Sequence, residues 1–90
     1  MNKRDALDAV IDTMAEVVKP LVQSIEASIP TTQNHYAEYM TVIHVLATQC
    51  PVGDNPEMIR KVHIGIGVAL QRAGANHKGV QSALRAMGML

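Results

Sequence analysis

Residues 71–90 read QRAGANHKGVQSALRAMGML, and this pattern predicts two helices joined by a tight turn. Gly74 marks the turn, because glycine adopts without strain the left-handed backbone that commonly ends a helix. Val80, Leu84 and Met87 follow at helical spacing, so they fall on one side of a short last helix. The end of the chain is thus predicted to be helical, and the remaining sequence decides what these helices pack against.

The helix before the turn is predicted to run from Pro56 to about Ala73. Asp54 or Asn55 would cap its start. Pro56 suits the first helical position, where its missing N–H is harmless, and the negative charge of Glu57 favours the helix dipole. The apolar line of this helix consists of Ile59, Val62, Ile66, Ala69, Leu70 and Ala73.

A long first helix is predicted from about residue 3 to residue 28. Apolar residues recur in it at alternating spacings of four and three, which is typical of helices that pack side by side. They are Leu7, Ile11, Met14, Val18, Leu21 and Ile25. Pro20 interrupts the backbone hydrogen bonding, so a kink is expected near residues 17–19, and the continuing pattern favours one kinked helix over two separate ones. Another face carries an acidic row, which consists of Asp5, Asp8, Asp12 and Glu16.

A second helix is predicted from about residue 34 to residue 49, with Thr32 or Asn34 as its cap. Its segment MTVIHVLA, residues 40–47, is rich in β-branched residues and could be mistaken for a strand. The length of the segment and the helical periodicity around it favour a helix. The sequence CPVGDNP then separates this helix from the third.

The composition supports an all-helical domain. The chain has 90 residues, 48% of them hydrophobic, which is enough for one domain with a modest core. Only 2% are aromatic, so the core must come from aliphatic side chains and six methionines, a set that suits close-packed helices better than a sheet. The predicted fold is all-α: a single domain over residues 1–90, built as a small bundle of about four helices, the first long and kinked at Pro20.

Charges are unevenly distributed along the chain, although they cancel overall. Residues 1–57 contain three basic and eight acidic residues, whereas residues 58–90 contain five basic residues and no acid. A basic half of this kind suggests an anionic partner, or a contact with an acidic face.

Nothing in the sequence suggests a membrane or a secreted protein. No stretch is long and apolar enough to span a bilayer, and no secretory signal is visible at the start. Cys50 is the only cysteine, so no disulfide forms within the chain, and the cytoplasm is the expected location.

Residues 69–89, and above all AGANHKGVQSALRAMGM, resemble the C-terminal helix-turn-helix of the Fis family (factor for inversion stimulation). The matching positions are Ala73, Gly74, Val80, Leu84, Met87 and Gly88. Members of this family are small, cytosolic, all-helical and dimeric, so the resemblance implies a dimer that binds DNA. The match covers roughly 20 of the 90 residues. The helix before the turn is about twice as long here as in the family, and Gly79 is a poor helix former near the start of a recognition helix.

The resemblance implies that the exposed face of the last helix contacts DNA. The residues of that face are His77, Lys78, Gln81, Ser82 and Arg85. His77 and Lys78 follow the predicted helix cap Asn76, where positive charge opposes the helix dipole. A phosphate bound there would reverse this effect, because free N–H groups and Lys78 would point at it together. In the alternative, Lys78 is simply solvated.

Other groups of polar residues give weaker indications. His35 and Glu38 are spaced to share a helix face, but a metal site needs three or four converging ligands, and no metal site is predicted. Cys50 lies on the apolar line of its helix, which predicts a structural thiol rather than a nucleophile. His35, Tyr36 and Tyr39 gather at one helix start, either to contact a base or a protein partner or as an edge of the core.

The sequence therefore predicts a non-enzymatic binding protein without a cofactor. Its basic C-terminal half would engage an anionic partner, with DNA at the helix-turn-helix-like end as the most concrete candidate. The alternatives are an oligomeric protein-binding regulator or inhibitor that uses the first helix, and a nucleotide-sequestering helical oligomer. A homo-oligomer is expected, because the seam of the first helix is longer than a short bundle can cover. Its interface would consist of Leu7, Ile11, Met14 and Val18.

Overall fold

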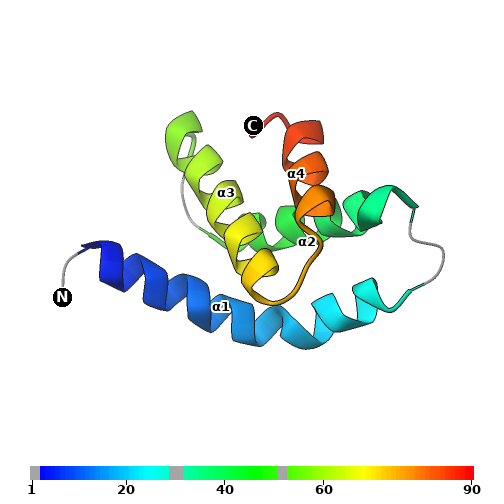
Figure 1. Cartoon of the computed structure of the whole chain (residues 1–90). Helices are drawn as coiled ribbons and strands as arrows, with labels where there is room; N and C mark the ends of the chain where they lie inside the picture. Colours follow the sequence, from blue (N-terminus) through cyan, green and yellow to red (C-terminus); the bar gives the residue numbers. More distant parts are fainter. Residues whose placement is uncertain (1–2, 29–31, 51–52) are drawn as a thin grey trace.

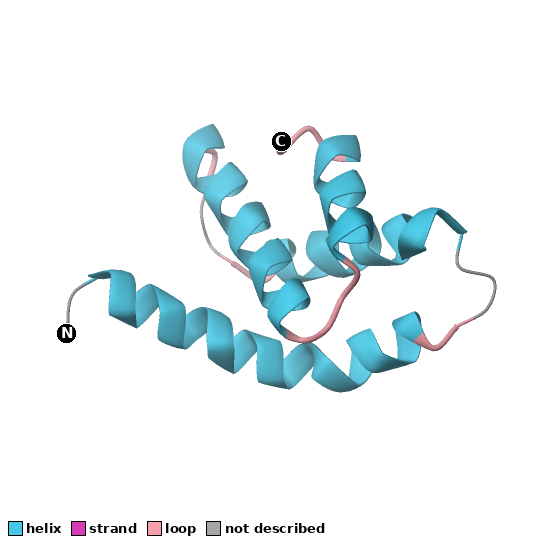
Figure 2. Cartoon of the chain, viewed as in Figure 1, coloured by secondary structure: helices cyan, strands magenta, loops and turns pink. Residues whose placement is uncertain are grey.

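The computed structural model describes residues 3–28, 32–50 and 53–90, and these ranges form an all-helical fold (Figures 1 and 2). The elements are α1 (Lys3–Glu26), the 3-10 turn η1 (Thr32–His35), α2 (Tyr36–Thr48), α3 (Pro56–Arg72) and α4 (His77–Ala86). No strand occurs in these ranges, so the predicted small all-α bundle is confirmed, including the helix over MTVIHVLA.

The first helix is continuous, as its apolar spacing predicted. α1 runs from Lys3 to Glu26 and passes through Pro20 without a break. Figure 1 shows that its blue first half and its cyan second half point in different directions. Within the described part of the chain, no helix combines the length and the apolarity that a bilayer span requires.

The start of α2 differs from the prediction. Neither Thr32 nor Asn34 caps this helix; the N-cap is His35, whose side chain makes no capping hydrogen bond. Asn34 and His35 both have positive φ angles, 57° and 65°. This backbone region is uncommon outside glycine but several-fold enriched in Asn and His. Two left-handed residues in succession give the chain a sharp turn between η1 and α2, which sequence propensity alone did not indicate.

The caps around α3 and α4 follow the sequence closely. Asn55 caps α3 by accepting two backbone N–H groups, and Pro56 occupies its first turn. Gly74 follows Ala73, the C-cap of α3, and has a φ of 107°, which is the positive φ expected of a glycine that ends a helix. The side chain of Asn76 caps α4 by accepting the backbone N–H of Gly79 at 3.1 Å.

The helices enclose one aliphatic core. α1 packs mainly against α3, whereas α2 packs against α4 and α3, so α3 is the centre of the fold. Figure 1 shows α1 lying across one side of the assembly formed by α2, α3 and α4. The largest fully buried side chains are Val22, Tyr39, Ile43, Ile66, Leu70, Val80 and Leu84. α1 therefore has one side in the core and leaves its other sides in contact with solvent.

Candidate functional site

The predicted DNA-contacting residues lie on one helix, and most of them share its exposed side. α4 buries Gly79, Val80, Ala83 and Leu84 against the rest of the fold. We call the opposite side the α4 outer face and define it as His77, Lys78, Gln81, Ser82 and Arg85. Lys78 and Arg85 are exposed, and the two polar residues between them are half-buried. His77 lies at the edge of this face, with its Nδ1 atom 2.8 Å from Oε1 of Gln71.

Gly79 allows the backbone of α4 to approach the turn before α2 closely. A Cβ atom at this position would overlap the carbonyl oxygen of Asn34 and would lie 3.2 Å from Cδ2 of Tyr39. The backbone of α4 can therefore meet the turn before α2 only because residue 79 has no side chain. The glycine that was unexpected in a recognition helix thus has a packing role.

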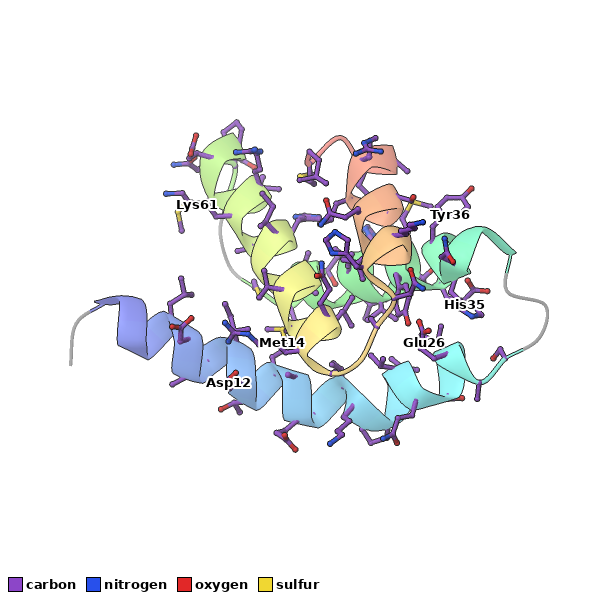
Figure 3. All side chains as sticks on the ribbon, in the orientation of Figure 1. Asp12, Met14, Glu26, His35, Tyr36 and Lys61 are labelled. Carbon is purple, nitrogen blue, oxygen red and sulfur yellow. The ribbon has the colours of Figure 1, made fainter. Side chains whose placement is uncertain are left out.

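A carboxylate from α1 lies at the start of α4. The Oε2 atom of Glu26 accepts the backbone N–H of Asn76 at 3.0 Å, and it also accepts the hydroxyl hydrogen of Tyr39. Figure 3 shows Glu26 at the end of α1, facing the other helices. The chain therefore places its own negative charge at the helix end where a phosphate was predicted, and this charge favours the dipole of α4.

The environment of Tyr39 shifts its ionisation. Its side chain is fully buried. Burial raises the pKa of Tyr39 well above its usual value, and the hydrogen bond to Glu26 and the negative charge of Glu26 raise the pKa further. Tyr39 therefore acts as a neutral hydrogen-bond donor inside the fold, and not as a surface group.

The proposed partner-binding cluster at the start of α2 is mostly inaccessible. His35 is 3% exposed and Tyr39 is not exposed at all, whereas Tyr36 is half-buried. The rings of His35 and Tyr39 meet edge to face, with their centroids 6.5 Å apart. Nε2 of His35 is buried and has no hydrogen-bond partner among the described residues. Tyr39 thus belongs to the core, with His35 buried beside it, and of these three residues only Tyr36 is partly open to a partner.

The structure does not assemble a metal site from the candidate ligands. His35 belongs to η1 and is buried, whereas Glu38 is exposed on α2, so the two do not share a helix face. Among the described residues, no three His, Cys, Asp or Glu side chains are grouped as metal ligands. Cys50 is half-buried, rather than buried, and its thiol lies 3.6 Å from the carbonyl oxygen of Leu46.

Part of the charge asymmetry is neutralised within the chain. Arg72 at the end of α3 pairs with Asp12 at 2.9 Å and with Asp8 at 3.4 Å, so part of the basic half meets the acidic row of α1. The side chain of Arg60 donates to the carbonyl oxygen of Met89 at 3.1 Å. Lys61 lines a hollow between α1 and α3. The basic residues of the C-terminal half therefore do not share one face.

The residues of the predicted oligomer interface fall into two groups. Ile11 and Val18 are core residues of the chain itself, with 8% and 6% exposure. Leu7 is 59% exposed and Met14 is half-buried. The apolar side chains of α1 that are exposed or half-buried instead form a second line, which we call the α1 strip. It consists of Leu7, Val10, Met14, Val17 and Leu21.

Sequence reasoning missed Val10 and Val17, although a signal was present. These residues alternate with Leu7, Met14 and Leu21 at spacings of three and four, as the core residues of α1 also do. Two seams overlap in one helix, and only the structure shows which of them the chain covers.

Comparisons of this chain with protein-family models, with curated proteins and with solved structures yield no match of any of the three kinds.

Proposed function

We propose that this protein is a non-enzymatic binding protein that contacts duplex DNA through the α4 outer face. The observation that carries the proposal is the state of the cations in the C-terminal half. Arg60 and Arg72 are engaged within the chain. The other three cations are exposed and form no ion pair among the described residues. Lys78 and Arg85 share the α4 outer face, whereas Lys61 stands apart on α3. Such free cations favour DNA, because their contacts with phosphates release condensed counterions.

The arrangement of this face suits a helix that lies against a DNA groove. Lys78 and Arg85 are seven residues apart, which is nearly two helical turns and roughly 10 Å along the axis. Gln81 and Ser82 lie between them. Cationic side chains commonly hold phosphates, whereas amide and hydroxyl groups can hydrogen-bond to base edges. The resemblance of residues 69–89 to a helix-turn-helix supports the same assignment.

The contacts that hold α4 in the fold also support a binding role. The close contact at Gly79 and the hydrogen bond from Asn76 to Glu26 hold the helix from two sides. A helix held in this way presents its side chains without a large ordering cost on binding. The nucleotide-sequestering alternative has less support, because only Tyr36 of the aromatic cluster is accessible for stacking.

The experiment is a fluorescence anisotropy titration of a labelled duplex of random sequence, at two salt concentrations. Wild type is expected to bind at low salt and to weaken as salt rises. The double variant Lys78→Ala, Arg85→Ala should bind more weakly to every sequence. Its salt slope should be flatter by about two units, one for each phosphate that the variant no longer neutralises. Gln81→Ala should instead change the preference among sequences.

The matched control is the double variant Lys19→Ala, Lys61→Ala, which removes the same number of charges from exposed positions away from the α4 outer face. It should bind as wild type does. Absence of wild-type binding at low salt would refute the proposal, and so would equal losses in the two double variants, because binding would then depend on net charge alone.

A further inference from the structure

α1 carries two apolar seams, and the chain covers only one of them. The residues of the α1 strip follow one another at spacings of three, four, three and four. This is the spacing of helices that pack side by side with interlocking side chains. The other seam, which includes Ile11 and Val18, packs inside the chain. The α1 strip has the pattern of a packing surface, but the described helices leave most of it exposed.

The strip is well exposed, and its outer border is uncharged. On its inner side, Lys61 of α3 lines the same hollow as Leu7, Val10 and Met14. Val17 is 73% exposed and Val10 is 58% exposed. From residue 6 to residue 21, the exposed residues that border the strip on its outer side are small or cyclic and uncharged: Ala6, Ala9, Thr13 and Pro20. Small side chains allow another helix to approach closely. Soluble monomers rarely leave a large continuous apolar surface of this kind open to water.

The hydroxyl group of Thr13, on this flank, already has a hydrogen-bond partner within the helix. Oγ1 of Thr13 donates to the carbonyl oxygen of Ala9 in the preceding turn, at 2.9 Å. Covering the flank with another helix therefore leaves this donor with its partner, whereas a buried donor without a partner would cost about 1–3 kcal/mol. The flank can be buried at low cost.

The apolar surface continues from α1 onto α2. A groove of about 320 Å³ runs between the two helices, and its lining consists of Val18, Leu21, Thr41, Val42, Val45 and Leu46. The hydroxyl of Thr41 donates to the carbonyl oxygen of Ala37 at 3.1 Å, so this residue also presents no free donor. The groove extends the α1 strip into a surface that spans two helices.

The exposed area of the chain is larger than a monomer of its mass usually has. A folded monomer of 9.7 kDa exposes about 5100 Å² according to the general scaling with mass. This chain exposes 5854 Å². The difference is roughly 700 Å², close to the ~800 Å² that each partner buries in a standard stable interface. The excess is thus comparable in size to one partner's share of a standard interface, and the exposed residues of the α1 strip contribute to it.

We infer that the α1 strip and the adjoining groove are the contact surface between two copies of this chain. A two-fold axis brings the same patch of both copies together. An uncharged flank suits such pairing, because a patch that carried charge would meet its own like charges across the axis. The exposed acids Asp8 and Asp12 lie on the opposite flank of α1, where they pair with Arg72 of the same chain. Glu16 lies between the two flanks and is exposed.

The test measures mass in solution, by sedimentation equilibrium of the full chain without DNA. Wild type is expected to have twice its monomer mass at micromolar concentrations. Val17→Glu places a charge at the most exposed position of the strip and should give a monomer. Because Val17 is exposed in the single chain, the helical circular dichroism of the variant should match that of wild type.

The matched control is Gln23→Glu, which adds the same charge to an exposed position on the other flank of α1. It should remain dimeric. Val10→Glu is the second test of the strip and applies if Val17→Glu does not fold. A wild type that stays monomeric up to near-millimolar concentration would overturn the inference, as would folded strip variants that assemble as wild type does. The result does not depend on DNA binding, so this experiment tests the dimer independently of the proposed DNA-binding function.

Discussion

Tyr39 of α2 donates its hydroxyl hydrogen to the carboxylate of Glu26 at the end of α1. The same oxygen of Glu26 accepts the backbone N–H of Asn76, the cap of α4, at 3.0 Å. One carboxylate oxygen therefore joins three helices. This junction holds the start of α4.

The free energy of unfolding should fall with rising pH above about pH 10, the ordinary pKa of tyrosine. The pKa of Tyr39 is raised in the folded chain, so the unfolded chain loses this proton first. Folding then retains a proton that the unfolded state has released, and stability decreases by up to about 1.4 kcal/mol per pH unit. Below that pH both states hold the proton, and the contribution is fully present. Urea unfolding between about pH 9 and pH 12 measures this dependence. The curve of Tyr39→Phe should be flatter than that of wild type, and parallel curves would contradict the assignment.

Glu26→Ala should destabilise the fold by up to about 1–3 kcal/mol for each part-buried donor that it leaves without a partner. The two donors are the hydroxyl of Tyr39 and the backbone N–H of Asn76. Glu26→Gln keeps an oxygen acceptor and should cost less. Glu16→Ala is the control on the same helix, because Glu16 is exposed, and it should change stability by less than about 0.5 kcal/mol. Equal thermal midpoints for Glu26→Ala and Glu16→Ala would show that the junction contributes nothing.

Two glycine-to-alanine substitutions should have opposite effects. Gly79→Ala forces α4 and the Asn34 backbone apart and should cost on the order of 1–3 kcal/mol or more. At Gly65, inside α3, an added Cβ meets nothing within 4 Å. Gly65→Ala should therefore stabilise the fold by about 0.5–1 kcal/mol through helix propensity. Denaturant unfolding of both variants compares these effects. Gly65 lines the hollow between α1 and α3, so destabilisation by Gly65→Ala would show that the added methyl group disturbs the packing of these helices.

Features set by neighbours in the sequence were predictable. Asn55, Gly74 and Asn76 act within one turn of their own helix ends, so their residue types indicated the caps directly. The left-handed pair Asn34 and His35 was not predictable in this way. Its conformation matches a contact with Gly79, which lies far away in the sequence and becomes a neighbour only in the fold.

The candidate sites show the same division. The side of α4 that carries Lys78 and Arg85 followed from helical spacing and is exposed as expected. The partners of these charged and polar side chains could not be predicted, because nothing in the local sequence indicates that Arg72 pairs with Asp12 or that Glu26 binds Tyr39. The choice between two overlapping seams of α1 was likewise beyond reach, because both have the same spacing and only tertiary packing distinguishes them.

The contacts that hold α1 have a consequence for the order of folding. Its links to Arg72 and Asn76 join residues 50 to 64 positions apart in the sequence. Closing a loop of that length costs more chain entropy than closing the short connections between α2, α3 and α4. We therefore expect α1 to dock last and to detach first, which native-state hydrogen exchange would detect as faster opening of α1 than of α3. The three-helix unit of α2, α3 and α4 would then form first, and α1 would pack onto it in the last step of folding.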